Sequence, residues 1–167
     1  MSTTQFTEIA EKSILDTFNR QIYLGTQMVY SYVSTSAGST EVPGLILTNP
    51  FQSGKNLFVS SLKLICSTAS QTVIARAYFN PTVTGAGTPV TAVNLRPAST
   101  YASIATLASA PTVSGNGTLV ASLNASQTRF DNSNLLQVLD QGQVLFITIQ
   151  ASAASVASTL QISWYEL

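Results

Sequence analysis

The amino-acid sequence predicts an all-β protein, a jelly-roll-like antiparallel β-sandwich with a short N-terminal α-helix. After Gly25 the apolar residues recur with period two in short runs, and turn residues separate these runs roughly every 8–15 positions, as in antiparallel sandwiches. Hydrophobic residues make up 45% of the 167 residues and charged residues only 8%. The chain can therefore fill one core, and it lacks the composition of a disordered segment.

The first residues follow a different pattern from the rest of the chain. Apolar side chains recur there at steps of four and line one face of a predicted helix: Phe6, Ala10, Ile14, Phe18 and Ile22. Thr4 can cap the start of this helix, and Gly25 can end it. We therefore divide the chain into an N-terminal helical arm, residues 1–25, and a β-sandwich domain, residues 26–167. The apolar stripe is the predicted partner-binding site, and the alternative is that it covers one end of its own sandwich.

The predicted strands of the sandwich follow in order along the chain. They are residues 28–33, 42–48, 57–66, 73–79, 90–95, 103–108, 118–123, 135–139, 144–149 and 160–165. Two turns, at residues 49–54 and 80–85, share the pattern N-P-x-x-[ST]-G directly after a strand. Proline ends ladder pairing and glycine supplies a positive φ, so we interpret the pattern as shared turn chemistry and not as a repeat.

The chain contains no histidine, which removes the commonest general base and the commonest metal ligand. A Ser-His-Asp or Cys-His nucleophile cannot be assembled, and a single cysteine cannot support the usual zinc or iron sites. That cysteine, Cys66, lies in an apolar run and is predicted to be a small buried hydrophobe.

Carboxylates are the remaining route to catalysis. Asp131 and Asp140 are a conceivable glycosidase pair, but no motif joins them, and solvated loop carboxylates are the simpler interpretation. Residues 49–56 lack the first glycine and the final Ser or Thr of a phosphate-binding loop. We therefore expect a protein that is not an enzyme and has no cofactor and no metal site.

Charge and hydropathy argue against nucleic acid and membrane as partners and favour other copies of the chain. The seven basic residues are dispersed, so we expect no nucleic-acid binding. We also expect no membrane span and no signal peptide, and synthesis in a cytoplasm. With a formal net charge of zero, little repulsion keeps copies apart, and self-association is favoured.

Several turn and strand-edge sequences resemble a family of tailed-bacteriophage virion proteins. The resemblance covers Leu47 to about Leu119, under half of the chain. It is carried by N-P and S-G-K within residues 49–55, L-F-V at 57–59, F-N-P-T at 79–82, G-T-P-V at 87–90 and N-L at 94–95, and by the closing W-Y-E at 164–166. It implies a β-sandwich protein of the capsid or tail, often trimeric, that is a decoration (cement) protein or part of a fibre and has no catalytic residues. The helical start shows no match.

This resemblance, together with the lack of catalytic residues in the sequence, implies a structural protein of the virion. The leading hypothesis is a capsid decoration protein that forms a homotrimer and contacts the major capsid protein or other virion proteins. The alternative is a fibre or tail module that binds a host receptor or glycan. Such a module should cluster aromatic residues in its loops, whereas the loop aromatics Phe51, Tyr101 and Phe130 are dispersed. A third hypothesis, a carboxylate-dependent hydrolase, requires two close acids in a cleft.

Overall fold

The computed structural model describes residue 20 and residues 24–126, 131–133 and 137–167, and these residues form fourteen β-strands. The strands are β1 (Gln27–Ala37), β2 (Val42–Thr48), β3 (Leu57–Cys66), β4 (Thr72–Phe79), β5 (Thr82–Gly85), β6 (Thr88–Pro89), β7 (Val93–Asn94), β8 (Thr106–Ser109), β9 (Thr112–Gly115), β10 (Thr118–Ser126), β11 (Asp131–Ser133), β12 (Gln137–Leu139), β13 (Val144–Ala151) and β14 (Val156–Glu166).

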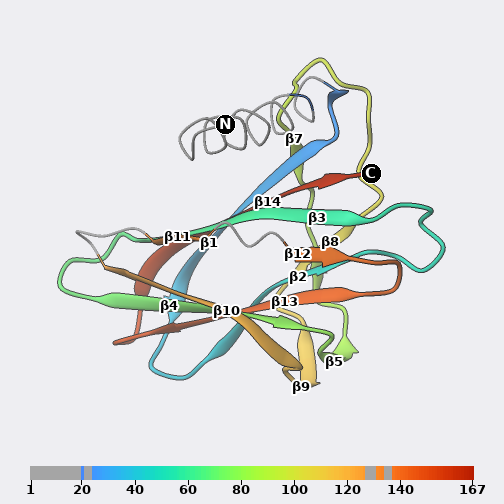
Figure 1. The fold of residues 1–167 in the computed structure, drawn as a ribbon. Coiled ribbons are helices and arrows are strands. Elements are labelled where there is room, and N and C mark those ends of the chain that lie inside the picture. Colours follow the sequence, from blue (N-terminus) through green and yellow to red (C-terminus); the bar gives the residue numbers. More distant parts are fainter. Residues whose placement is uncertain (1–19, 21–23, 127–130, 134–136) are drawn as a thin grey trace, which may run out of the picture.

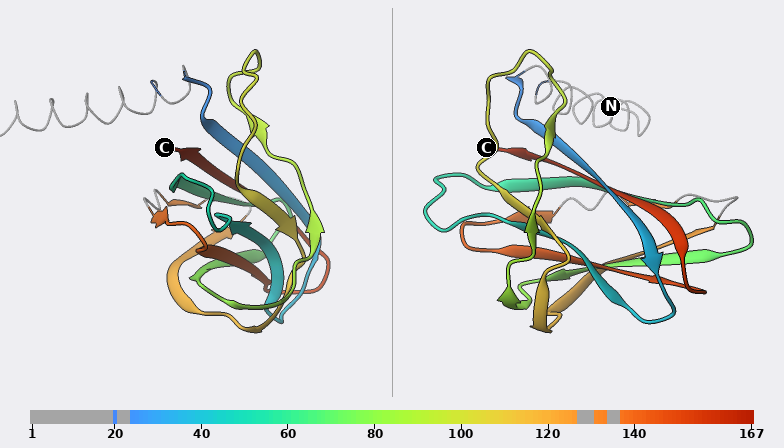
Figure 2. Two further views of the ribbon diagram at one scale, coloured as in Figure 1. Left: turned by 90° about the vertical axis from the view of Figure 1, so that its right-hand side faces the viewer. Right: turned by 180° about the vertical axis from the view of Figure 1, so that it is seen from behind.

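The two large sheets have the strand order of a jelly roll (Figures 1 and 2). Sheet A has the order β11-β3-β14-β1-β7, with β12 also paired to β3, and sheet B has the order β10-β4-β13-β2-β8-β6. The first and last strands in the sequence, β1 and β14, pair in sheet A. The second and the second-to-last strands, β2 and β13, pair in sheet B. β3 and β4 then add to β14 and β13, and these pairs are all antiparallel. This nested winding is the double Greek key of a jelly roll, so the predicted all-β antiparallel sandwich is confirmed. The predicted N-terminal helix lies outside the described residues.

The core lies between the two sheets and follows the period-two alternation of the sequence. Leu160, Ile162 and Trp164 project inward from β14 and are fully buried, as their spacing predicts. Cys66 is also buried, and its Sγ lies 3.5 Å from the carbonyl oxygen of Gln71. The prediction that this cysteine is a small core residue is therefore confirmed.

The connection from β4 to β10 differs most from the predicted strands. It contains a separate two-stranded sheet, β5–β9, and the short strands β6, β7 and β8, which extend one edge of each large sheet. The predicted strands at 90–95 and 103–108 are reduced to residues 93–94 and 106–109. Pro89 and Pro97 bracket the first of these, and a residue without an N–H cannot extend a ladder. The sequence also does not predict β11, which pairs with β3.

The two Asn-Pro turns, which share a sequence pattern, flank the same strand. Asn49 follows β2 and Asn80 follows β4, and both strands pair with β13. The N–H of Asn49 donates to the carbonyl oxygen of Gln143 at 3.0 Å, and that of Asn80 donates to Val144 at 2.8 Å. Both turns therefore end a neighbour of β13 at the same end of the sandwich.

The predicted stripe of the arm lies outside the described residues. This holds for each of its members, Phe6, Ala10, Ile14, Phe18 and Ile22. Gly25 has a φ of 72°, the left-handed conformation expected of a glycine that ends a helix. Its carbonyl oxygen accepts hydrogen bonds from Asn94 Nδ2 (2.6 Å) and Ser99 Oγ (3.3 Å). The loop after β7 thus holds the start of β1 (Figure 2). Within the described part of the chain, no helix is long and apolar enough to cross a membrane.

Candidate interaction surface

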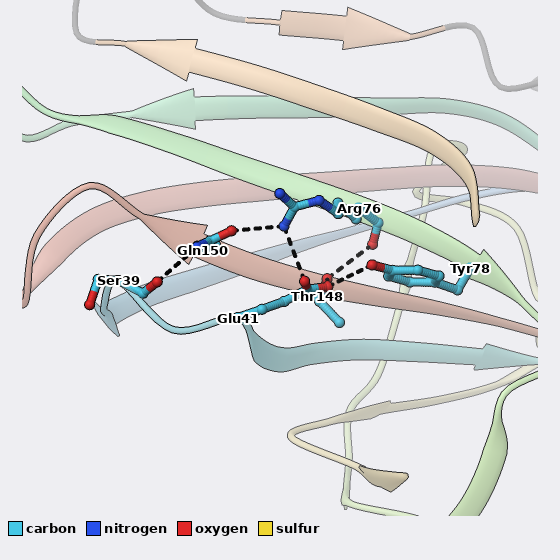
Figure 3. A network of polar contacts seen from close by, with 6 residues as sticks. All are labelled: Ser39, Glu41, Arg76, Tyr78, Thr148 and Gln150. Atoms are coloured by element: carbon cyan, nitrogen blue, oxygen red, sulfur yellow. Dashed lines mark hydrogen bonds and ion pairs between the residues drawn. The ribbon is translucent and has the colours of Figure 1, made fainter. Parts of the chain in front are cut away.

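A polar cluster on the outer face of sheet B fixes the β1–β2 connection to β4 and β13 (Figure 3). Glu41, just before β2, accepts hydrogen bonds from Tyr78 Oη (2.8 Å) and Thr148 Oγ1, and it forms an ion pair with Arg76 Nη1 at 3.1 Å. Arg76 Nη1 also donates to Gln150 Oε1 at 2.9 Å. Burial, and then the hydrogen bond to Glu41, raise the pKa of Tyr78, so its hydroxyl remains a donor. The Glu41 carboxylate is therefore fully engaged in holding a loop.

A second carboxylate, Glu166, is 1% exposed and holds the segment before β8. Its oxygens accept hydrogen bonds from Tyr101 Oη (2.5 Å), Ser103 Oγ (2.5 Å), the Ile104 N–H (3.1 Å) and Trp164 Nε1 (3.3 Å). A buried carboxylate is tolerated only with such donors around it. Glu166 therefore joins the last strand to the loop of residues 99–105.

Tyr101 connects this carboxylate to a cation. Lys55 Nζ lies 2.6 Å from Tyr101 Oη and 4.4 Å from the centre of its ring. Burial, and then the hydrogen bond and charge of Glu166, raise the pKa of Tyr101 well above its ordinary value. The phenol therefore keeps its proton and acts as a hydrogen-bond donor to Glu166.

The other two carboxylates of the described residues, Asp131 and Asp140, are too far apart to form a glycosidase pair. Asp131 pairs with Leu64 of β3, whereas Leu139, next to Asp140, pairs with Leu57. Seven strand positions, roughly 23 Å, separate these points. Glycosidase pairs lie about 5–10 Å apart. Among the described residues, no three His, Cys, Asp or Glu side chains gather as they do in a metal site.

A cavity of about 280 Å³ lies beneath residues 90–105, and its wall includes Met28, Leu107 and Trp164. The polar side chains of Asn94 and Ser103 also line it, but both already bond within the chain, to Gly25 and Glu166 respectively. Sugars require several polar partners in addition to apolar contact. The cavity therefore does not provide a convincing glycan site.

The outer face of sheet A carries almost no charge. Its side chains are hydroxyls, amides, aromatics and aliphatics, and Lys63 is the one charged residue among those that face outward from the described parts of β1, β3 and β14. The set comprises Val29, Ser31, Val33, Phe58, Ser60, Ser61, Lys63, Ile65, Thr159, Gln161, Ser163 and Tyr165.

Four apolar side chains at one end of this face form what we call the aromatic patch: Phe58, Val138, Tyr165 and Leu167. Phe58 and Tyr165 pair across β3 and β14, and their rings stack with centroids 5.0 Å apart at an angle of 2°. Val138 pairs with Phe58 from β12 and is 40% exposed. Leu167 follows Tyr165 by two residues and is 54% exposed. Aromatic side chains in a charge-depleted setting are typical of the cores of protein interfaces.

Gln27 lies in the same row of the sheet as the patch. It pairs with Tyr165 and is fully buried, and its Nε2 donates to Ser60 Oγ at 3.2 Å. Its Oε1 has no hydrogen-bond partner among the described residues. A buried acceptor without a donor costs about 1–3 kcal/mol, so a donor brought by another segment would be stabilising here.

The structure tests only some of the residues that the sequence singles out. The stripe of the arm and Phe130 lie outside the described residues. Tyr101 is engaged with Glu166, and Phe51 is 79% exposed on the first Asn-Pro turn. The sequence analysis does not identify the aromatic patch. The available signal is the alternation within L-F-V at 57–59 and W-Y-E at 164–166, which turns Phe58 and Tyr165 away from their buried neighbours.

Comparisons with known proteins give only distant likenesses. No family model matches the chain, and no curated protein matches it. A mitogen derived from Yersinia pseudotuberculosis is 12% identical with a TM-score of 0.38, over 81% of this chain and 83% of that one. A structure of Bacillus endospore appendages, which form disulfide-linked pili, is 12% identical with a TM-score of 0.37, over 84% and 87%. The capsid structure of a Helicobacter pylori bacteriophage is 9% identical with a TM-score of 0.31, over 83% of this chain and 92% of that one. These likenesses are too distant to assign a function.

Proposed function

We propose that this chain is a non-enzymatic structural protein of a virion, a capsid decoration protein that acts through protein–protein contacts. The observation that carries the proposal is the outer face of sheet A. This face bears one charged side chain among its described residues, Lys63, and ends in the stacked pair Phe58–Tyr165 with exposed apolar neighbours. A surface of this composition favours burial against another protein.

The polar groups of the chain support a structural role. Glu41 and Glu166 are each surrounded by internal donors that fix loops to strands. Without histidine, neither cluster has a base to activate a nucleophile. Rigid loops and an uncharged face suit a protein that recognises its partner by shape.

Homotrimer formation and location on the virion belong to the same proposal. The formal net charge of zero favours self-association, and the stripe of the arm is a second apolar surface. The resemblance of residues 47–119 to tailed-bacteriophage virion proteins gives the assembly its context.

The test uses the full chain, labelled and added to purified particles that lack it, with binding measured by sedimentation and by imaging of the particles. We expect the chain to occupy regular sites on the capsid, and Val138→Asp to abolish this binding. The matched control is Val33→Asp, because Val33 is 64% exposed on the same face but roughly 20 Å along β14 from the patch. A chain that does not bind particles, or an unaffected Val138→Asp variant, contradicts the proposal. Binding only to tail fibres favours the receptor-binding alternative, for which Phe51 is the exposed aromatic.

A further inference from the structure

The first Asn-Pro turn carries an aromatic side chain that its own copy does not bury. Phe51 is 79% exposed, more than any other large hydrophobic side chain among the described residues. Its turn, between β2 and β3, projects from one end of the sandwich (Figure 1). A single exposed apolar side chain is common on protein surfaces, so its meaning depends on whether the chain also offers a site that fits it.

The turn that carries Phe51 is held by a buried asparagine. Asn49 is fully buried, and its Nδ2 donates at 2.8 Å both to the carbonyl oxygen of Lys55 and to that of Leu139. Because these bonds fix the backbone and the phenylalanine side chain has few torsions, burying the ring costs little conformational entropy. Phe51 is therefore well suited to act as an anchor in a contact with another protein.

The cavity beneath residues 90–105 has the size and the lining of a site for one aromatic ring. Its volume is about 280 Å³, and its wall includes Met28, Leu107 and Trp164. An apolar cavity of about 150 Å³ holds a benzene molecule, so this one accommodates a phenyl ring together with its methylene group. Contacts of an aromatic ring with a thioether or an indole are favourable.

The rest of the wall leaves only apolar contact to a ligand. Three polar side chains in the wall, Asn94, Tyr101 and Ser103, already bond within the chain. None of the described residues that line the cavity is charged. Thr91 and Ala102 belong to the wall and are exposed, so the cavity reaches the surface beside them. The site therefore suits an uncharged apolar group that enters from outside.

Phe51 leans toward β13, whereas the cavity lies toward β8. These two strands are the neighbours of β2 on its two sides. The Phe51 ring lies beside the turn before β13, because a Cβ added at Gly142 would be 3.5 Å from Phe51 Cδ2. β8 contributes Leu107 to the wall of the cavity, and Phe51 is not part of that wall. Phe51 is therefore presented to a neighbouring molecule and not to the cavity of its own copy.

We propose that Phe51 of one copy inserts into the cavity beneath residues 90–105 of a second copy. This inference rests on the proposed function, because it names the contact that builds the homotrimer. The ring and the cavity are different surfaces of the chain, so the contact is heterologous and closes into a ring of copies when the rotation permits. The aromatic patch takes no part in it and stays available to the capsid.

The test removes the aromatic ring and fills the cavity in separate full-length chains. Phe51→Ser removes the ring, and Ala105→Leu fills the cavity, with Ala92→Leu as a second filling variant in case the first strains the fold. By sedimentation equilibrium, each variant alone should be monomeric, with association weakened at least about 30-fold, as for an interface hot spot. A mixture of the two kinds should form a 1:1 heterodimer, because one intact ring then meets one intact cavity.

The emission of Trp164 provides a signature of insertion. Trp164 is the one tryptophan of the chain and lines the cavity. Its emission should change when the unaltered chain is diluted and the copies separate, and it should not change when Phe51→Ser is diluted. Toluene, which is the phenylalanine side chain as a free molecule, should bind Phe51→Ser with a similar change in emission and should dissociate the unaltered oligomer.

Matched controls make similar substitutions away from the contact. Val33→Ser removes an exposed apolar side chain from sheet A, and Ala98→Leu enlarges an exposed residue of the same loop outside the cavity wall. Both should associate like the unaltered chain, and urea denaturation reports that each variant is folded.

Three results would overturn the proposal. They are an unaltered chain that is monomeric, a mixture that stays monomeric, and a Phe51→Ser variant that still forms the full oligomer. An oligomer that is lost in Phe18→Ser but kept in Phe51→Ser assigns the contact to the N-terminal arm instead. If the unaltered chain nevertheless binds particles, the decoration role stands and only the Phe51 contact fails.

Discussion

Replacing Tyr101 by phenylalanine tests whether the buried carboxylate Glu166 fixes the loop before β8. The substitution keeps the ring and removes one hydroxyl, which donates to Glu166 Oε2 at 2.5 Å and accepts from Lys55 at 2.6 Å. Glu166 keeps the donors Ser103 and Ile104 but loses the one from the phenol. A hydrogen bond to a charged, buried acceptor contributes about 1.5–3 kcal/mol, so we expect the free energy of unfolding to fall by that amount.

The measurement is urea denaturation followed by the fluorescence of Trp164, which is fully buried and contacts the same carboxylate at 3.3 Å. With a slope of about 2 kcal/mol per molar urea, the expected shift of the midpoint is roughly 1 M. Tyr165→Phe is the matched control, because its hydroxyl makes no hydrogen bond to any described residue, and it should shift the midpoint far less. Equal shifts for the two variants would refute the reasoning.

Three further predictions follow from the same contacts. Because the pKa of Tyr101 is raised above its ordinary 10.0, the folded chain holds this proton more tightly than the unfolded chain. The contribution of this proton to stability is complete below pH 10 and is lost as the pH rises further. When the free energy of unfolding is measured by urea denaturation above pH 10, it should therefore fall less steeply with pH in Tyr101→Phe than in the unaltered chain. Glu41→Gln leaves Tyr78 with a weaker acceptor and should cost about 1–2 kcal/mol by urea denaturation, with little effect of added salt on the loss. Gly117→Ala places a methyl group 2.2 Å from the carbonyl oxygen of Phe79 at a φ of +85°, so its midpoint of thermal unfolding should fall by more than that of Gly38→Ala, which meets no atom within 4 Å.

The sequence predicts the sandwich well because apolar residues alternate with others along the long strands, and this alternation shows which face of each strand is buried. In β14 the inward residues Leu160, Ile162 and Trp164 are apolar at every second position, and all are fully buried. The insertion between β4 and β10 is predicted poorly. Its strands are two to four residues long, too short for alternation to be distinguished from chance.

The candidate surface could not be assembled from local patterns. Phe58 and Tyr165 stack although 107 positions separate them, and their contact follows from the pairing of β3 with β14 and not from either segment alone. The local sequence also does not predict the burial of Glu166, because its donors Tyr101 and Ser103 lie in a loop more than 60 residues away. Alternation reveals which side a residue faces, whereas a site depends on which strands become neighbours.

Two of the few charged side chains, Glu41 and Glu166, are used inside the molecule. Glu41 and Glu166 satisfy their oxygens with donors inside the chain and so tie two loops to the strands. The contact that we propose on sheet A would use shape, hydroxyls and the stacked Phe58–Tyr165 pair, because Lys63 alone supplies charge on that face within the described strands. A surface of this kind gives little electrostatic steering and little screening by salt. It suits a contact that forms once and persists, as the contacts of an assembled particle do.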